Sequence, residues 1–351
     1  MERSLRKALK GDRLTLEEAL YLYGIPLLDL AYLAQRVRER WNPADRITFA
    51  VDRNINYTNI CVCQCRFCAF HRPPGHPEGY VLDREELGRK IEELLAQGGT
   101  HVLLQGGLHP GLSLAWFEEL FTWIKTRYPV GLHALSPPEI HHLAQLEGLT
   151  VKEVLKRLME AGLDSLPGGG AEVLVDRVRQ RVSPRKIPAH LWLEVMETAH
   201  RLGLKTTATM VIGLGETLEE RLLHLEHLRQ LQDRTGGFTA FILWTLQTQG
   251  IDLKAEKTTS LEYLRFLALS RVYLDNFPHL QASWVTQGLE VGQTALFFGA
   301  DDLGSTMMEE NVVKAAGAAF QATKESLIHC IRKAGFLPAQ RDHLYNILSY
   351  Y

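Results

Sequence analysis

The chain has 351 residues, of which 46% are hydrophobic and 23% are charged. These shares are ordinary for a folded globular protein, and they exclude a collagen-like, disordered or membrane-embedded chain. Its 39 Lys and Arg residues nearly balance 41 Asp and Glu residues, which gives a formal net charge of -2. This balance provides no global electrostatic reason to bind nucleic acid or an anionic membrane, so a small-molecule substrate is the first expectation.

The N-terminal region is rich in charge and lacks the apolar core of an export signal. No run of about 18 apolar residues occurs anywhere, so no transmembrane helix is expected. We therefore expect a cytoplasmic protein. Three helical stretches, at roughly 3–9, 16–22 and 27–40, predict an N-terminal helical extension over residues 1–45.

Beyond residue 45, short β-rich runs alternate with amphipathic helical runs, with no internal repeat or linker. Thr150 and Glu153 form a capping box before one apolar helical face, and Gly162 marks the end of that helix. The expected strands lie at 47–51, 101–105, 130–134, 163–166, 205–211, 238–244, 280–284 and 295–298. Eight strands that alternate with helices predict a TIM-type (β/α)8 barrel over residues 46–351, ending in a C-terminal helix, with its chemistry at the C-terminal strand ends.

Four of the five cysteines lie within eight residues, directly after the first expected strand. Neighbours this close rarely form disulfides, so we expect a metal site. Cys61, Cys65 and Cys68 have the spacing C-x3-C-x2-C, which suits three thiolates of an iron–sulfur cluster that leaves one iron open. A structural zinc site, the less favoured alternative, takes four ligands in two separated pairs, and this sequence has no second pair. Cys63 is expected to be a bystander and Cys330 a packing residue.

This spacing, with the aromatic Phe67 before the last cysteine, resembles the signature of the radical S-adenosylmethionine (SAM) enzymes. The resemblance implies a radical SAM barrel, a [4Fe-4S] cluster on Cys61, Cys65 and Cys68, and SAM bound at the open iron. It also implies that the reduced cluster cleaves SAM to a 5′-deoxyadenosyl radical, which takes a hydrogen atom from the substrate. The electron would come from a low-potential donor such as flavodoxin or ferredoxin.

Polar and glycine-rich segments after the second and third strands are candidates for the SAM site. Gly106 and Gly107 follow Gln105, and they would let bare backbone approach a ligand, although a plain turn would read the same way. By resemblance, this strand end holds the methionyl amine of SAM. Ser136, which precedes Glu139 after the third strand, is another candidate, although this stretch fits an ordinary helix start equally well.

Three consecutive glycines precede Glu172 after the fourth strand. The resemblance implies that Glu172 accepts hydrogen bonds from the ribose hydroxyls of SAM. It also implies that Arg177 binds the carboxylate of SAM, with Arg179 and Arg181 as alternatives. After the fifth strand, residues 209–216 match in part the motif GxIxGxxE, which packs the adenine ring in this family. Gly213 of that motif is retained.

Longer strings, at 52–59, 68–70, 281–284 and 304–312, resemble the branch of the family that acts in the futalosine route to menaquinone. They favour a cyclase that acts on a nucleoside, dehypoxanthine futalosine. The resemblance implies hydrogen abstraction at C4′ of the ribose, attack of that carbon on the substrate's benzoate ring, and loss of one electron and one proton. Related alternatives are aminofutalosine synthase and the tyrosine-coupling subunit of coenzyme F420 synthesis. A non-catalytic iron–sulfur electron carrier is the alternative from a different class.

Loss of a proton from the ring requires a base. The candidates at expected strand ends are His109, Asp301, Asp302, Glu309 and Glu310, and the sequence does not choose among them. The Glu309–Glu310 pair fits a solvated helix start equally well.

Overall fold

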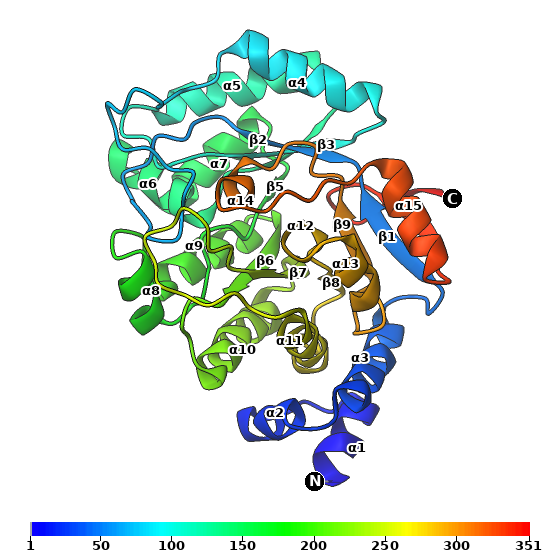
Figure 1. Ribbon diagram of the computed structural model, residues 1–351. Coiled ribbons are helices and arrows are strands. Elements are labelled where there is room, and N and C mark those ends of the chain that lie inside the picture. Colours follow the sequence, from blue (N-terminus) through cyan, green and yellow to red (C-terminus); the bar gives the residue numbers. More distant parts are fainter. Residues whose placement is uncertain (1) are drawn as a thin grey trace.

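A curled sheet with helices packed around its outside forms the centre of the computed structural model, which describes residues 2–351 (Figure 1). The strand order is β11-β10-β1-β9-β8-β7-β6-β5-β4-β3-β2, and all neighbours are parallel except β10 and β11. The strands are β1 (Arg46–Ala50), β2 (Asp52–Asn56), β3 (His101–Gln105), β4 (Gly131–Ala134), β5 (Ser165–Leu166), β6 (Lys205–Ile212), β7 (Phe238–Thr245), β8 (His279–Gln281), β9 (Asp302–Ser305), β10 (Leu337–Arg341) and β11 (Ile347–Tyr350).

One continuous segment, residues 46–56, forms both β1 and β2 and joins the two ends of the barrel. Its first half, β1, pairs with β9, and its second half, β2, pairs with β3. Counted as one strand, this segment and β3–β9 make eight parallel strands, which confirms the predicted (β/α)8 fold class. The carboxyl ends of these strands, and therefore the loops that follow them, gather at one mouth of the barrel.

Helices cover the outside of the barrel, and local sequence sets their ends. The predicted capping box at Thr150 and Glu153 begins α7, and Gly162 ends it with φ +118°. The covering helices are α4 (Arg84–Ala96), α5 (Leu114–Arg127), α6 (Pro137–Glu147), α7 (Val151–Ala161), α8 (Asp176–Val182), α9 (Ala189–Arg201), α10 (Leu218–Thr235) and α11 (Ser260–Tyr273). Later in the chain follow α12 (Trp284–Gln287), α13 (Leu289–Ala295), α14 (Asn311–Ala315) and α15 (Lys324–Lys333).

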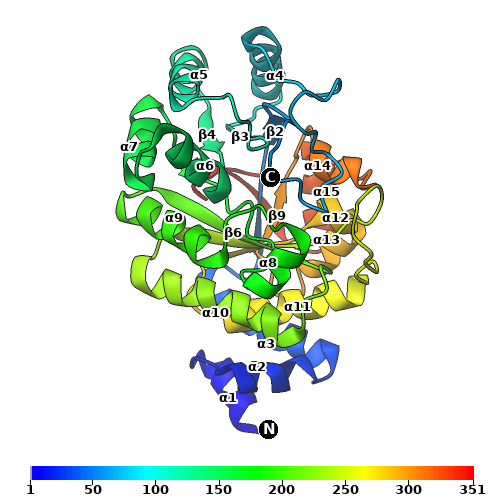
Figure 2. The same ribbon diagram turned by 90° about the vertical axis from the view of Figure 1, so that its left-hand side faces the viewer.

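The N-terminal helices α1 (Glu2–Lys10), α2 (Leu16–Tyr23) and α3 (Leu27–Trp41) lie outside the barrel, at the bottom of both views (Figures 1 and 2). The helices α3 and α2 pack against α11, and α2 also packs against α10. Among residues 2–351, no helix combines the length and the apolar character needed to cross a membrane.

The predicted eighth strand at 295–298 is wrong. Ala295 ends α13, and the residues after it form a turn in which Leu296 and Phe298 are buried. This apolar run packs a helix end against the barrel, and the strand itself comes later, at β9. Its sequence, Asp-Leu-Gly-Ser, has no β-branched residue to mark it.

A C-terminal hairpin that the sequence did not predict closes the base of the barrel. Its first strand, β10, runs parallel to β1 on the side that faces away from β9. Gln340 donates a hydrogen bond to the carbonyl of Gly98 at 3.1 Å. Arg341, His343 and Tyr345 reach into the barrel and help to line an internal cavity of about 70 Å³.

Candidate active site at the mouth of the barrel

A cavity of about 300 Å³ opens at the carboxyl ends of the strands. It brings together residues from the loops after β2, β3, β4, β5 and β9, which are far apart in the sequence. The sequence-predicted residues that line it are Cys61, Cys65, Cys68, Phe67, Gln105, Gly106, Gly107, Ser136, Glu172 and Glu310. Leu103, Trp244 and Met307 line both this cavity and the smaller one beneath it, so they form the floor of the mouth.

Two thiols of the cysteine loop, residues 61–68, point inward because its side chains alternate between buried and exposed. Cys63 and Cys65 are buried, whereas Gln64 and Arg66 between and after them are exposed. Backbone bonds fix the loop at both ends: the Cys61 amide donates to Arg72 at 2.9 Å, and the Cys68 amide donates to Cys65 at 3.1 Å. The Leu108 amide donates to the Cys61 sulfur at 3.3 Å, which ties the loop to the strand end after β3.

The thiols differ in how readily they ionise. A hydrogen bond with Cys63 lowers the pKa of Cys61 to about 5, and the same kind of bond lowers the pKa of Cys65. These bonds raise the pKa of Cys63, whose sulfur also lies 3.7 Å from the carbonyl oxygen of Arg185, a second acceptor for its one hydrogen. Burial raises the pKa of Cys68. Thiolates, not thiols, bind metals, so the electrostatics favour Cys61 and Cys65 over Cys63 as ligands.

The chemistry of this donor set fits a cluster better than a single ion. Within residues 2–351, no three Cys, His, Asp or Glu side chains converge on one point as the ligands of a single metal ion do. Cluster thiolates each bind a different iron, so they need only line one cavity, as Cys61, Cys65 and Cys68 do.

Gly106 and Gly107 permit close packing between two loops. A Cβ on Gly106 would lie 2.6 Å from the Tyr57 ring, and one on Gly107 would lie 2.2 Å from the carbonyl oxygen of Ile60. The Gly107 amide donates to Thr58 at 3.1 Å in the same contact. The backbone that these glycines must approach is therefore that of the cysteine loop, whose position next to the cavity depends on them.

Glu172 lies at the cavity wall with two cations. Lys186 donates to one carboxylate oxygen at 2.7 Å, and Arg179 donates to the other at 3.3 Å. Arg177, expected to bind the carboxylate of SAM, does not line the cavity; its exposed guanidinium pairs with Glu220 at 2.6 Å. Arg179 is two residues from both Arg177 and Arg181, about 200° around α8, so when Arg179 faces Glu172 the other two arginines face away. Sequence reasoning missed Lys186, which lines the cavity.

Glu139 lies in the first turn of α6, and its carboxyl group does more than begin that helix. It accepts hydrogen bonds from the Tyr57 hydroxyl at 2.8 Å, from the Gly106 amide at 3.1 Å and from the Ser136 hydroxyl. Burial raises its pKa to about 7 against the lowering effect of these donors. The carboxyl group of Glu139 therefore links two segments: the backbone at Gly106, which follows β3, and Tyr57, which precedes the cysteine loop.

Gly213 does not reach the cavity lining. Its amide donates to Glu216 at 2.9 Å, and a Cβ on it would meet the Thr258 hydroxyl at 2.8 Å. With φ +96°, this residue makes the turn that leads from β6 to α10. Gly213 thus lies outside the lining of the mouth cavity, and its role in packing the adenine ring stays a prediction.

Of the five base candidates, Glu310 alone lines the mouth cavity. It accepts the amides of Val312 and Val313 at 2.9 and 3.1 Å and the amide group of Asn54 at 2.5 Å, and burial raises its pKa. The carboxylate of Glu309 turns away to Lys90, at 2.7 Å, and to Arg53. The ring nitrogen of His109 accepts the amide of Gly111 at 2.9 Å, in a small side cavity.

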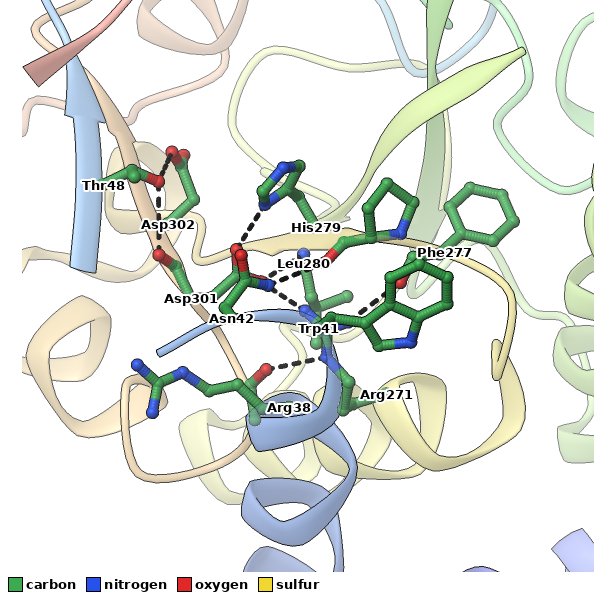
Figure 3. A network of polar contacts seen from close by, with 12 residues as sticks. Arg38, Trp41, Asn42, Thr48, Arg271, Phe277, His279, Leu280, Asp301 and Asp302 are labelled. Atoms are coloured by element: carbon green, nitrogen blue, oxygen red, sulfur yellow. Dashed lines mark hydrogen bonds and ion pairs between the residues drawn. The ribbon is translucent and has the colours of Figure 1, made fainter. Parts of the chain in front are cut away.

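Asp301 and Asp302 belong to the base of the barrel, which corrects their expected place at its mouth (Figure 3). Asp301 precedes β9 and pairs with Arg271 and, at 2.6 Å, with His279. Asp302 begins β9 and accepts the Thr48 hydroxyl at 2.6 Å. The misplaced eighth strand is the reason: when the strand moves from 295–298 to 302–305, these residues pass from its end to its beginning.

Comparisons with known proteins agree with this geometry. The Radical SAM superfamily matches residues 55–228, and the CofH/MqnC C-terminal region matches residues 235–350. The chain is 46% identical to cyclic dehypoxanthine futalosine synthase of Halalkalibacterium halodurans, over 98% of this chain and 94% of that protein. The same-named protein of Streptomyces coelicolor is also 46% identical, over 98% and 88%. Aminodeoxyfutalosine synthase of Thermus thermophilus is 42% identical, over 97% and 93%.

Among solved structures, the FeFe-hydrogenase maturase HydG from Carboxydothermus hydrogenoformans superposes with a TM-score of 0.79 at 19% identity, over 98% of this chain and 80% of that chain. At this identity the likeness supports the fold alone. The family assignment depends on the sequence relatives, because they align over nearly the whole length of both chains. The chain therefore belongs to the radical SAM superfamily and, within it, to the family that carries the CofH/MqnC C-terminal region.

Proposed function

We propose that the protein is a radical SAM cyclase that converts dehypoxanthine futalosine to its cyclic product in the route to menaquinone. The observation that carries the proposal is the gathering of Cys61, Cys65 and Cys68 with Glu172 and Glu310 around one cavity at the barrel mouth. The 46% identity to cyclic dehypoxanthine futalosine synthases supports this choice among the chemistries of the family.

The residues present fit the cofactors of the family. Cys61, Cys65 and Cys68 would hold a [4Fe-4S] cluster, and the Leu108 amide donates toward one of these sulfurs, the kind of bond that tunes a cluster. When bound, the cluster and SAM supply the radical that takes a hydrogen atom from the substrate. Glu172 and Lys186 offer a carboxylate and an ammonium group on the same wall, suited to hydroxyl and carboxylate groups of SAM.

The chain's own side chains then orient the substrate, exclude water and receive a proton. Leu103, Trp244 and Met307 give the cavity an apolar floor, against which an aromatic ring can pack. We assign Glu310 as the base that accepts the ring proton, since it lines the cavity and its raised pKa makes its carboxylate a stronger base. Asn54 donates to that carboxylate and fixes its direction.

Two further parts of the proposal concern the cell. A reductant protein with a low-potential centre, such as flavodoxin or ferredoxin, supplies the electron. The protein acts in the cytoplasm, where the thiols of its cysteine loop stay reduced.

The test is to incubate the anaerobically reconstituted protein with SAM, a reductant and dehypoxanthine futalosine deuterated at C4′. The proposal expects a product two hydrogens lighter than unlabelled substrate and deuterium in the 5′-deoxyadenosine. Formation of 5′-deoxyadenosine without deuterium transfer would contradict the cyclase. If the protein, given an enol ether of benzoate as substrate, joins the adenosyl group of SAM to that ether, it is an aminodeoxyfutalosine synthase, and if it cleaves no SAM with either substrate it is an electron carrier.

A further inference from the structure

The surface around the cysteine loop is basic in a chain whose net charge is -2. Residues 61–72 contain two Arg, and residues 177–186 contain five Lys or Arg, while neither segment contains Asp or Glu. The two segments pack side by side. The backbone amide of Arg66 donates to Val182 at 2.9 Å, and its guanidinium donates to the carbonyl of Arg181 at 3.4 Å.

Ion pairing leaves part of this charge uncompensated. The seven cations share four carboxylates, those of Asp252, Glu78, Glu220 and Glu172. The pair between Arg66 and Asp252 is exposed and long, at 3.6 Å. In the part of the chain that the structure describes, no carboxylate lies within ion-pair distance of Arg181 or Arg185, and both side chains are exposed.

This charge lies one residue from a proposed cluster ligand. The exposed Gln64 and Arg66 flank the buried Cys65 along the chain. Arg185 spans the same loop, since its guanidinium donates to the Gln64 side chain at 2.8 Å and its carbonyl accepts the Cys63 thiol at 3.7 Å. A protein that contacts Arg66 or Arg185 therefore stands directly over the backbone that carries Cys65.

We propose that Arg66, Arg181 and Arg185 form the docking surface for an acidic protein that carries a low-potential one-electron centre. The inference rests on the proposed function, which needs one electron per cleavage of SAM. In each encounter the reduced centre of the donor loses one electron and the oxidised cluster gains it, and no bond or proton is exchanged. The net charge of the chain cannot steer an acidic partner, so the local positive patch has to do so.

The test uses the reconstituted holoenzyme and a purified flavodoxin of negative net charge. The test variants are Arg185→Glu and the double variant Arg66→Glu/Arg185→Glu. Arg332→Glu is the matched control, because Arg332 is an exposed arginine on α15, on the opposite side of the barrel from α8 (Figure 1). Two quantities are measured: the dissociation constant for flavodoxin at several salt concentrations, and the rate of 5′-deoxyadenosine formation with either flavodoxin or dithionite as the reductant.

The proposal expects the double variant to bind flavodoxin about tenfold more weakly at low salt, a difference that added salt should shrink. Its flavodoxin-driven rate should fall with binding, while its dithionite-driven rate and those of the Arg332 variant stay at the wild-type level. Unchanged binding, or an equal fall of both rates, would overturn the docking surface.

These outcomes are separate from a failure of the proposed function. If wild type forms no cyclised product with either reductant, the cyclase assignment fails, whereas the binding measurement still decides whether the arginines recruit an acidic carrier.

Discussion

Cys63 differs from the other thiols of its loop in its hydrogen-bond partner, a backbone carbonyl. Its thiol donates to the carbonyl of Arg185, and its pKa is raised, whereas the pKa values of Cys61 and Cys65 are lowered. Burial raises the pKa of Cys68 as well, so the pKa separates Cys63 only from Cys61 and Cys65. A protonated thiol that bonds a backbone carbonyl is a poor metal ligand. The spacing C-x3-C-x2-C predicts the same division, but spacing alone cannot show which way a thiol points.

We predict that Cys63→Ala keeps its cluster and that Cys61→Ala, Cys65→Ala and Cys68→Ala each lose it. The check is iron and sulfide content, with the visible absorbance, after identical anaerobic reconstitution. Far-ultraviolet circular dichroism of all four variants controls for folding. A loss of iron from Cys63→Ala as complete as from the other three would show that the loop binds metal through a different set of thiols.

Glu139 should make stability depend on pH in a defined window. Burial raises its pKa to about 7 in the folded protein from 4.5, so the folded state holds this proton more tightly than the unfolded state. Its contribution to stability is therefore greatest below pH 4.5 and is lost as the pH rises through 7, by about 3 kcal/mol in total.

Glu139→Gln should remove this dependence, because an amide can still accept from Gly106 and Tyr57 but does not titrate. The measurement is urea unfolding of both proteins, without cofactors, at several pH values between 5 and 8. Wild type should lose stability relative to the variant across that range. A constant difference between the two would mean that Glu139 does not titrate there.

The arginines of α8 show where residue-level prediction from sequence stops. The sequence predicts Glu172 and one of three arginines at the SAM site, and the structure brings Arg179, not Arg177, to Glu172. Which arginine faces Glu172 depends on how α8 is rotated about its axis. The sequence does not fix that rotation, because this seven-residue helix has few apolar positions to show its buried face. Lys186 follows that helix in a loop, so no periodic pattern indicates which way it points.

At the scale of elements, the cysteine loop and the loop after β3 form one packed unit. A Cβ on Gly107 would lie 2.2 Å from the Ile60 carbonyl oxygen and 2.8 Å from the Cys61 Cβ. Neither backbone can retreat easily, since the Gly107 and Val62 amides bond across the same contact. The glycine-rich signal was visible in the sequence, but its partner was not, because the contact joins segments about 50 residues apart.

We predict that Gly107→Ala destabilises the protein by about 1–3 kcal/mol, as overpacking does, and lowers its iron content by displacing Cys61. Gly24→Ala is the control, since a Cβ there meets its nearest atom at an ordinary 3.5 Å. Thermal unfolding and iron analysis of both variants check the prediction. Wild-type iron content in Gly107→Ala would show that the loop tolerates the shift.

The sequence predicts the position of a strand where its apolar run is strong. The prediction fails where ionic contacts hold the strand in place. The first seven predicted strands overlap β1 and β3–β8. The strand β9 is held by buried ion pairs and by its neighbours, and its four residues include an aspartate and a glycine. The hairpin β10–β11 was missed for a related reason, because Arg341 and Gln340 are polar but buried.

For the molecule as a whole, Asp302 joins the strands that close the base of the barrel. It lies on β9, accepts the Thr48 hydroxyl of β1 at 2.6 Å, and pairs with Arg341 of β10 at 2.9 Å. All three side chains are buried. Removing one partner of a buried ion pair leaves the other charge without compensation, which costs far more than the pair contributes.

We predict that Asp302→Asn lowers the free energy of unfolding by about 3–5 kcal/mol. Because Asp302 lies at the base of the barrel, iron content of the folded fraction should not change. Urea unfolding and iron analysis, with the exposed Asp12→Asn as the control, test both statements. A normal stability with reduced iron would reverse the assignment and return Asp302 to the candidates for the reaction.

The barrel closes between its first strand and strands near its last residues, and this governs when the chain can fold. Thr48 and Asp302 are 254 residues apart in sequence, and β10 is more distant still. On the ribosome, Ile47 and Phe49 of β1 emerge long before their neighbours, so an apolar strand edge waits unpaired through most of synthesis. The ring cannot close until β9 has been made, so most of the chain must be synthesised before a complete barrel surrounds the cysteine loop and an iron donor meets a finished site.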